Sequence, residues 1–209
     1  MTQIDVTLTN FILFIESVTF AFFVSREKNE MKTPCLIIFL SLGSAALLGG
    51  LHHGFGSYLP VAINSFIWWL TLLLIGINAY GFALIGLALL VPSKVQVFHK
   101  SLLFLLGIYI LSIIFQRSYL MAIIFYLPSV FLTIAGFYAV YRKYPDGQIK
   151  IGIYGLGLSL LASVIQQLEI NIHPVYFTYN ALYHVMLMIA LYMFYVGLQV
   201  IPKLNVYAE

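Results

Sequence analysis

The sequence has very few charged residues and almost no cysteine. Of its 209 residues only 8% are Asp, Glu, Lys or Arg, whereas 62% are hydrophobic, and the mean hydropathy is +1.01. A soluble domain of this length needs more polar surface to cover its core, so the composition excludes one. The single cysteine, Cys35, excludes an internal disulfide framework and a zinc site built from cysteines. The net charge is +3, and the basic residues lie in short loops between apolar segments. This distribution argues against a nucleic-acid partner.

The sequence consists mostly of long apolar segments. A helix needs about 20 residues to cross the hydrocarbon of a bilayer, and seven segments come close to that length. They cover residues 7–25, 33–53, 60–90, 98–115, 118–141, 151–171 and 176–200. The third is long enough for a tilted span with a projecting end, and a break at residues 76–78 would give an eighth span instead. We predict one domain over residues 1–209, an all-α bundle of seven transmembrane helices.

The basic residues predict how this bundle is oriented. Nine of the ten fall on odd-numbered connections or the C-terminal tail: Arg26, Lys28, Lys32, Lys94, Lys100, Arg142, Lys143, Lys150 and Lys203. Only Arg117 falls on an even-numbered connection. The positive-inside rule therefore places the N-terminus outside and the C-terminus in the cytoplasm. Because no retention signal is evident, we expect a plasma membrane or a bacterial inner membrane, with the lipid bilayer as the surroundings.

Ionisable and amide side chains interrupt the apolar segments near one depth of the membrane. Such a group is costly in lipid unless it is paired or faces a polar cavity, so it marks a candidate functional site. Asn180 and His184 are four residues apart, which places both on one face of the last span. Gln166, Glu169 and His173 repeat in a similar way on the sixth span. The third span carries its own polar stripe, made of Asn64, Trp68, Thr71 and Asn78.

These stripes predict a polar cavity in the outer half of the membrane. The candidate site residues are Glu16, His52, His53, Asn64, Glu169, His173, Asn180 and His184. Structural roles stay open for most of them. The two histidines that close the second span can simply be wet, and the asparagines can hold helices together. Glu16 can clamp a neighbouring backbone or imidazole, whereas the depth of His184 favours a functional role.

Two short stretches resemble motifs of the CREST superfamily, a group of seven-span membrane hydrolases and receptors. The group includes alkaline ceramidases, adiponectin receptors and the Per1-type proteins. Residues 180–184, Asn-Ala-Leu-Tyr-His, resemble the family's His-x-x-x-His element in the last span. Residues 49–53, Gly-Gly-Leu-His-His, resemble its Ser-x-x-x-His element in the second span, with His53 as the best match. Glu16 resembles an acidic residue near that position in the ceramidase branch.

The chain departs from the family pattern at three positions. Asn180 replaces the first histidine of the last-span pair, Asn64 stands where the family has an aspartate, and Gly49 stands where it has a serine. When the family's metal ligands are transferred position by position, the resemblance therefore supplies only two histidine ligands, His53 and His184.

The resemblance implies a zinc ion that needs three protein ligands and an open position. A third ligand would come from the same outer layer, where the candidates besides Asn180 are His52, His173, Glu169 and Glu16. A zinc-bound water would attack a lipid amide or ester carbonyl, with Glu16 or Glu169 as the base and Asn64 beside the water.

Three functions therefore remain open from the sequence. The first is a zinc-dependent, ceramidase-like hydrolase of a membrane lipid. The second is a non-catalytic relative that binds a lipid or acts as a receptor, which the asparagine substitutions favour. The third is a haem-binding membrane protein, because histidines on facing helices can ligate haem.

Overall fold

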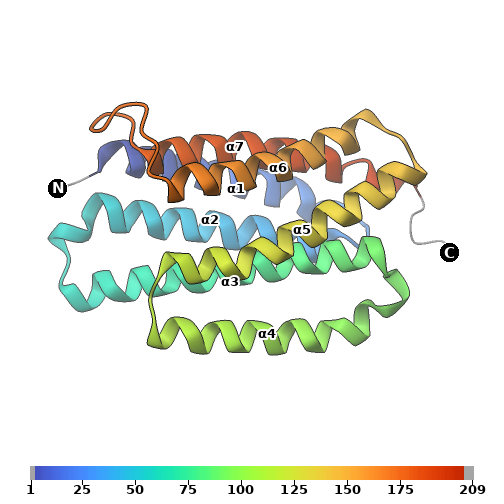
Figure 1. Cartoon of the computed structure of the whole chain (residues 1–209), viewed down its shortest axis with the longest axis horizontal. Coiled ribbons are helices and arrows are strands. Elements are labelled where there is room, and N and C mark those ends of the chain that lie inside the picture. Colours follow the sequence, from blue (N-terminus) through green and yellow to red (C-terminus); the bar gives the residue numbers. More distant parts are fainter. Residues whose placement is uncertain (1–2, 205–209) are drawn as a thin grey trace.

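The computed structural model describes residues 3–204, which form seven long α-helices and three short 3-10 turns (Figure 1). The helices are α1 (Ile4–Ser25), α2 (Lys32–Phe55), α3 (Val61–Leu90), α4 (Val95–Phe115), α5 (Tyr119–Lys143), α6 (Gly147–Gln167) and α7 (Tyr179–Leu198). The turns are η1 (Gly56–Tyr58), η2 (Pro92–Lys94) and η3 (Ile201–Leu204). All seven helices are long and apolar enough to cross a membrane, so this part of the prediction is confirmed.

Six of the helices form a closed ring, and α4 lies outside it. Around the ring α1 contacts α2, α2 contacts α3, α3 contacts α5, α5 contacts α6, α6 contacts α7, and α7 returns to α1. Helix α4 packs mainly on α3 and barely touches α5, which slants away from it (Figure 1). Only Tyr109 and Ile113 of α4 are buried. Most of α4 therefore faces outward from the bundle.

The two ends of the bundle differ in charge. We refer to the end where α2 finishes and α3 begins as the His53 end, and to the end that carries η2 as the Lys94 end. The connections with Arg26 and Arg142 lie at the Lys94 end, whereas Arg117 lies at the His53 end. Which end faces the cytoplasm stays a prediction.

Helix α6 ends earlier than its hydropathy predicts, at Gln167 and not near residue 171. The chain leaves the helix through Glu169, a non-glycine residue with a left-handed backbone (φ 53°). The amide of Ile170 then donates to the carbonyl of Ile165, a frequent way to end a helix. The predicted stripe of Gln166, Glu169 and His173 does not form, because only its first member is helical.

Helix α7 begins where distant side chains accept its free amides. The first amides of a helix lack partners within it, so capping acceptors set where it starts. One Asp5 carboxylate oxygen accepts hydrogen bonds from the amide and the hydroxyl of Thr178, at 2.9 and 2.7 Å. The side-chain oxygen of Asn171 accepts a hydrogen bond from the amide of Tyr179 at 2.8 Å. The N-terminal turn of α1 thereby ties α7 in place at the His53 end.

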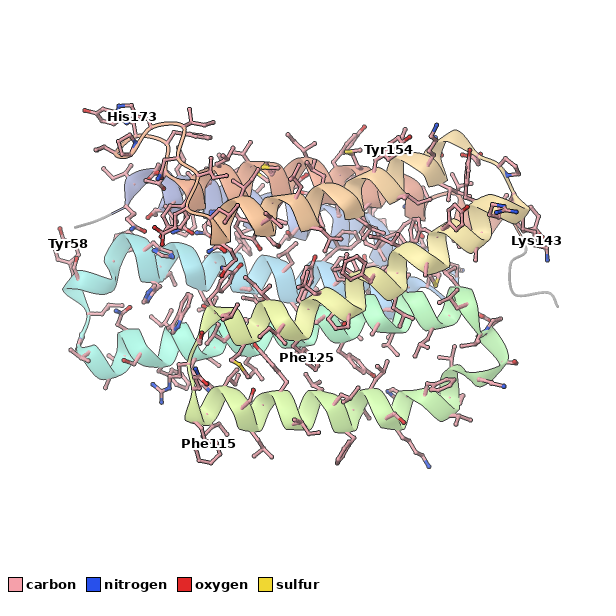
Figure 2. All side chains as sticks on the ribbon, in the orientation of Figure 1. Tyr58, Phe115, Phe125, Lys143, Tyr154 and His173 are labelled. Atoms are coloured by element: carbon pink, nitrogen blue, oxygen red, sulfur yellow. The ribbon has the colours of Figure 1, made fainter. Side chains whose placement is uncertain are left out.

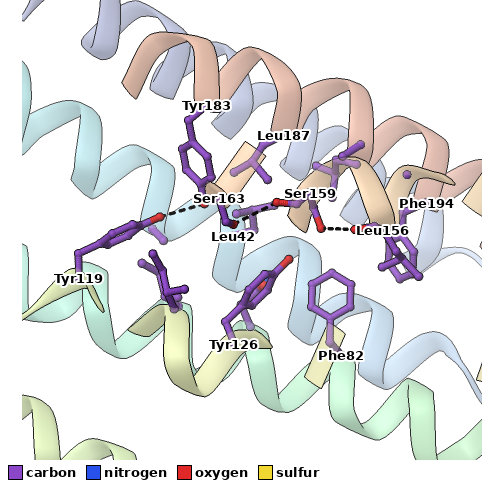
Figure 3. A pocket seen from close by; sticks show the side chains of 17 residues that line it. Leu42, Phe82, Tyr119, Tyr126, Leu156, Ser159, Ser163, Tyr183, Leu187 and Phe194 are labelled. Atoms are coloured by element: carbon purple, nitrogen blue, oxygen red, sulfur yellow. Dashed lines mark hydrogen bonds between the residues drawn. The ribbon is translucent and has the colours of Figure 1, made fainter. Parts of the chain in front are cut away.

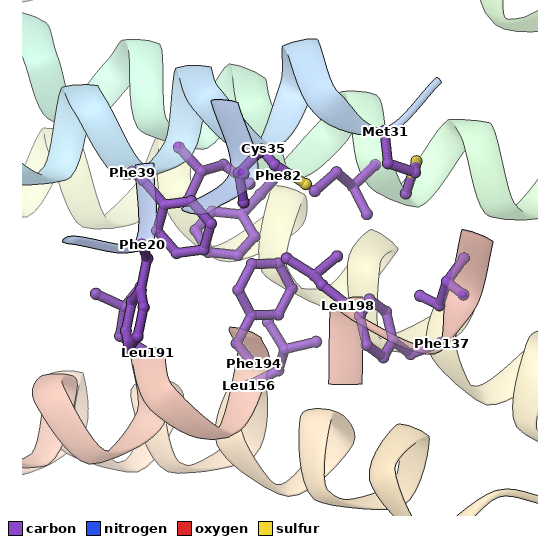
Figure 4. Close-up of a cluster of buried hydrophobic side chains, with 14 of the residues drawn as sticks. Phe20, Met31, Cys35, Phe39, Phe82, Phe137, Leu156, Leu191, Phe194 and Leu198 are labelled. Atoms are coloured by element: carbon purple, nitrogen blue, oxygen red, sulfur yellow. The ribbon is translucent and has the colours of Figure 1, made fainter. Parts of the chain in front are cut away.

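The largest hydrophobic core lies inside the ring and is rich in aromatic rings (Figure 4). The Phe194 ring lies 5.1 Å from Phe82 and 5.6 Å from Phe137, between ring centroids. Polar groups join helices at the same level. The Asn78 amide donates to the carbonyl of Ile38 at 2.8 Å, so this member of the predicted polar stripe joins α3 to α2. Such neutral bonds hold helices together in lipid, where burial alone drives little association.

Glycines let α6 and α7 approach closely. A side chain at Gly155 would place its Cβ 2.7 Å from the carbonyl oxygen of Ala190 and 2.9 Å from the amide nitrogen of Phe194. These neighbours are backbone atoms of α7, so they cannot move aside without shifting the helix. Nothing lies within 4 Å of the equivalent position at Gly157 on the same helix.

We therefore expect the Gly155→Val variant to be less stable by about 1–3 kcal/mol, since overpacking a tight contact forces backbone shifts. Thermal unfolding of the detergent-solubilised protein measures the difference. Gly157→Val makes the same chemical change at an open position and should unfold close to the wild-type temperature. Equal losses in both variants would contradict the close α6–α7 contact.

Candidate functional site

A cavity of about 180 Å³ lies at the His53 end, between helices of the ring. Side chains from α1, α2, α3, α5, α6 and α7 line it. Its polar lining residues are Asn10, His53, Thr71, Tyr119, Gln166, Tyr179, Asn180, Tyr183 and His184. None of the lining residues is Asp, Glu, Lys or Arg. The cavity therefore offers hydrogen bonds without formal charge.

The contact between His184 and Thr9 lets us assign a tautomer to His184 in the cavity. The Thr9 hydroxyl donates its single proton to the carbonyl of Asp5 at 2.9 Å, so its oxygen is left to accept. The Nδ1 atom of His184 lies 3.1 Å from that oxygen, and because the Thr9 hydroxyl faces the carbonyls of both Asp5 and Val6, we infer that Nδ1 donates in this hydrogen bond. The other ring nitrogen, Nε2, is then unprotonated. It is an acceptor for whatever occupies the cavity.

Two amides and two hydroxyls of the polar lining form hydrogen bonds with one another in pairs. The Gln166 amide donates to the Asn180 carbonyl oxygen at 3.3 Å, which leaves the amide hydrogens of Asn180 free to donate. The Tyr119 hydroxyl donates to that of Tyr183 at 2.9 Å, across α5 and α7. The predicted pairing of Asn180 and His184 on one face of α7 holds, because both line the cavity.

Asn10 supplies an acceptor from α1. Its Nδ2 donates to the carbonyl of Val6 at 3.0 Å, which leaves its Oδ1 as the free end. That oxygen lies 3.1 Å from where a Cβ at Gly49 would stand, so the absence of a side chain there makes room for it. Gly49 thus brings α1 and α2 together at the cavity wall.

The adjacent histidines of α2 face different surroundings. His53 lines the cavity. His52 does not: its Nδ1 lies 2.8 Å from the Asn64 carbonyl oxygen, and its ring stacks on Trp68 at 5.0 Å between centroids. Successive residues of a helix are rotated by about 100°, so two neighbours seldom face one site. His52 and Asn64 therefore hold α2 against α3.

The remaining candidates lie outside the cavity. Glu16 is half-buried in the middle of α1, and its Oε2 has no hydrogen-bond partner among residues 3–204. Glu169 and His173 are exposed in the loop between α6 and α7, with His173 near its tip (Figure 2). The His173 Nδ1 accepts hydrogen bonds from the amides of Val175 and Tyr176, at 3.2 and 3.1 Å, which shape the loop.

The residues at this site do not make up a zinc centre of the expected kind. A catalytic zinc ion needs three protein ligands and an open position. His53 and His184 line the cavity together, but Glu16, His52, Glu169 and His173 all lie elsewhere. Nowhere between residues 3 and 204 do three His, Cys, Asp or Glu side chains gather in a way that could hold a metal ion.

A second, apolar cavity of about 60 Å³ continues from the first toward the middle of the bundle (Figure 3). The two share six lining residues: Leu42, Ala45, Ile75, Tyr119, Tyr183 and Leu187. The far wall of the second cavity is made by Phe82, Leu156 and Phe194. Its two serines, Ser159 and Ser163, donate to carbonyls of their own helix at 2.8 and 3.0 Å, so their hydroxyl protons are already used. The polar cavity thus opens onto hydrocarbon-like walls.

Sequence reasoning missed several of these groups. Thr9, Asn10, Tyr119 and Tyr183 are neutral, and an isolated neutral polar residue in a span gives little signal. The only available sign was that Thr9 and Asn10 are adjacent polar residues within the first apolar segment.

No curated protein and no solved structure matches the chain. One family of unknown function, DUF6962, matches residues 6–203, which covers all seven helices except the first two residues of α1. The chain therefore belongs to the DUF6962 family.

Proposed function

We propose that this protein binds a neutral, amphipathic lipid, with the polar headgroup in the cavity at the His53 end and hydrocarbon in the apolar cavity that continues from it. The observation that carries the proposal is the union of an uncharged, hydrogen-bonding cavity with an apolar one inside a membrane bundle. Ligand sites usually combine mostly apolar walls with a few well-placed polar groups.

The available hydrogen-bonding groups define the headgroup. His184 Nε2 and Asn10 Oδ1 accept, and the Asn180 amide donates. A hydroxyl or an amide both donates and accepts, so it satisfies this combination. A charged headgroup would be buried without a counter-charge, which is strongly unfavourable. Monoacylglycerols, ceramide-like amides and other hydroxylated lipids fit this chemistry.

Trp68 offers a direct test of binding, since it lines the cavity and the only other tryptophan is its neighbour Trp69. In a Trp69→Phe background, a brominated monoacylglycerol added to phosphatidylcholine nanodiscs should quench Trp68 fluorescence in a saturable way. Unbrominated monoacylglycerol should reverse the quenching by competition. A specific site would be contradicted if quenching rose linearly with lipid concentration and brominated phosphatidylcholine quenched to the same extent.

The ceramidase-like hydrolase is the second candidate, and the observation that favours it is the meeting of His53 and His184 at one cavity. The resemblance to the CREST superfamily stays a prediction, as do catalytic roles for Glu16, Asn64 and Glu169. Of the candidate third ligands only Asn180 lines the cavity beside His53 and His184, and a side-chain amide is not one of the ligands that zinc usually takes.

The location of the protein belongs to the proposal as well. We propose that the Lys94 end faces the cytoplasm of a plasma membrane or a bacterial inner membrane, because nine of the ten basic residues belong to the predicted connections and the tail at that end. The haem hypothesis has no support beyond the two histidines, and a colourless purified protein without a Soret band would contradict it.

A further inference from the structure

A third cavity, larger than the two above, lies away from them between α3, α4 and α5. It measures about 520 Å³ and shares no lining residue with the cavity at the His53 end. It exists because α4 packs on α3 but barely touches α5. Phe125 points from α5 toward α4 (Figure 2) and stacks on Tyr109 at 4.6 Å between centroids, at the floor of the groove.

The lining of this groove suits hydrocarbon better than water. Most lining residues are Leu, Ile, Phe, Met, Ala or Pro. The Tyr109 hydroxyl donates to the carbonyl of Leu72 at 2.7 Å, and the Ser112 hydroxyl donates to the carbonyl of Tyr109 at 2.7 Å. Water needs several polar partners to be stable in a cavity, and these hydroxyls have already used their protons. In a bilayer the adjacent acyl chains are the natural filling.

One end of the groove carries positive charge without acidic neighbours in its own helices. Tyr80 lines the groove, and its ring lies 6.0 Å from that of His99 on α4. Lys100 follows directly, but it is two residues, or about 200° of helix rotation, from the lining residue Leu102, so it faces away from the groove. Lys94 lies in η2, just before α4, and both lysines are exposed.

Two acids of this end, Glu27 and Asp146, are engaged elsewhere, and Glu30 is exposed in the connection between α1 and α2. No Asp or Glu occurs between Glu30 and Asp146, a stretch that includes all of α2, α3, α4 and α5. Glu27 accepts hydrogen bonds from the side chains of Asn29 and Gln199, at 2.7 and 2.6 Å. Asp146 caps the start of α6 by accepting from the amide of Gln148 at 2.7 Å.

We propose that this groove binds a phospholipid with an anionic headgroup, whose acyl chain fills the apolar walls and whose phosphate lies against Lys94 and His99. Basic groups at the end of a cleft between transmembrane helices suit anionic headgroups, and a lysine near such a surface contributes measurably. A zwitterionic headgroup would gain less from the same groups.

The test is native mass spectrometry of the full chain in detergent, titrated with phosphatidylglycerol or with phosphatidylcholine of identical acyl chains. We expect phosphatidylglycerol to bind more tightly. Lys94→Gln should weaken phosphatidylglycerol binding about fivefold and leave phosphatidylcholine binding unchanged. Lys100→Gln removes the same charge from the outward face of α4 and should have little effect.

A second pair of variants tests the groove itself. Leu105 and Leu103 are both on α4 and both 48% exposed, but only Leu105 lines the groove. Leu105→Trp should fill the groove and reduce binding of both phospholipids, whereas Leu103→Trp should bind like wild type. Equal binding of the two lipids by wild type, or equal effects within either pair of variants, would overturn the proposal.

Discussion

The Ala45→Phe variant is expected to lose its neutral lipid while keeping its fold. Ala45 lies on α2, is only 5% exposed, and lines both the polar cavity and the apolar one. A phenyl ring at this position would project into the space where we place the junction of headgroup and chain. Lipid extracted from the purified protein and quantified by mass spectrometry should fall by about tenfold or more, as expected when a ring occupies a binding cavity.

Ser44→Phe is the matched control for this variant. Ser44 is the preceding residue of the same helix, but it is exposed and does not line either cavity. It adds a ring of the same size to the outer surface of α2. If Ser44→Phe lost as much neutral lipid as Ala45→Phe, the lipid would belong to the annulus around the bundle and not to the cavity.

Removing the acceptor at His184 is expected to weaken the binding of lipids whose headgroup donates a hydrogen bond. His184→Ala deletes Nε2, and a lost hydrogen bond in a buried site reduces affinity by about tenfold. Thr9→Val removes the oxygen that accepts from Nδ1 and so releases the tautomer, with a smaller loss in the same direction. Thr9→Ser keeps the hydroxyl and should restore affinity. Trp68 quenching by the brominated monoacylglycerol measures all three.

A fatty acid methyl ester of the same chain length separates this role from a structural one. It has no hydroxyl to donate, so wild type and His184→Ala should bind it equally. A loss of affinity for the ester as large as that for the monoacylglycerol would mean that His184 only holds the bundle together, through its contact with Thr9.

The seven helices were predictable because hydropathy alone decides which segments fit a bilayer. The shared face of Asn180 and His184 followed from helical spacing. The end of α6 was not predictable, because the left-handed turn at Glu169 depends on the local backbone. Glu169 was therefore placed on a helix that had already ended. The start of α7 was not predictable either, because the cap from Asp5 on Thr178 is a contact across 173 residues.

The site itself was predicted only in part. The sequence pointed to His53 and His184, and both line the cavity. The motif resemblance favoured His53 over His52, but helical spacing alone could not separate them, because the rotation of α2 against its neighbours decides which ring faces inward. The role of Thr9 could not be predicted for another reason, because Thr9 contacts a histidine 175 residues away in the sequence.

Native mass spectrometry of the mildly solubilised wild-type chain tests the central claim most directly. We predict one intact neutral lipid bound to each chain, absent from Ala45→Phe, with no stoichiometric zinc. A chain that instead carries one zinc ion, lost in His184→Ala, and that releases fatty acid from the lipid would contradict this account and support the hydrolase.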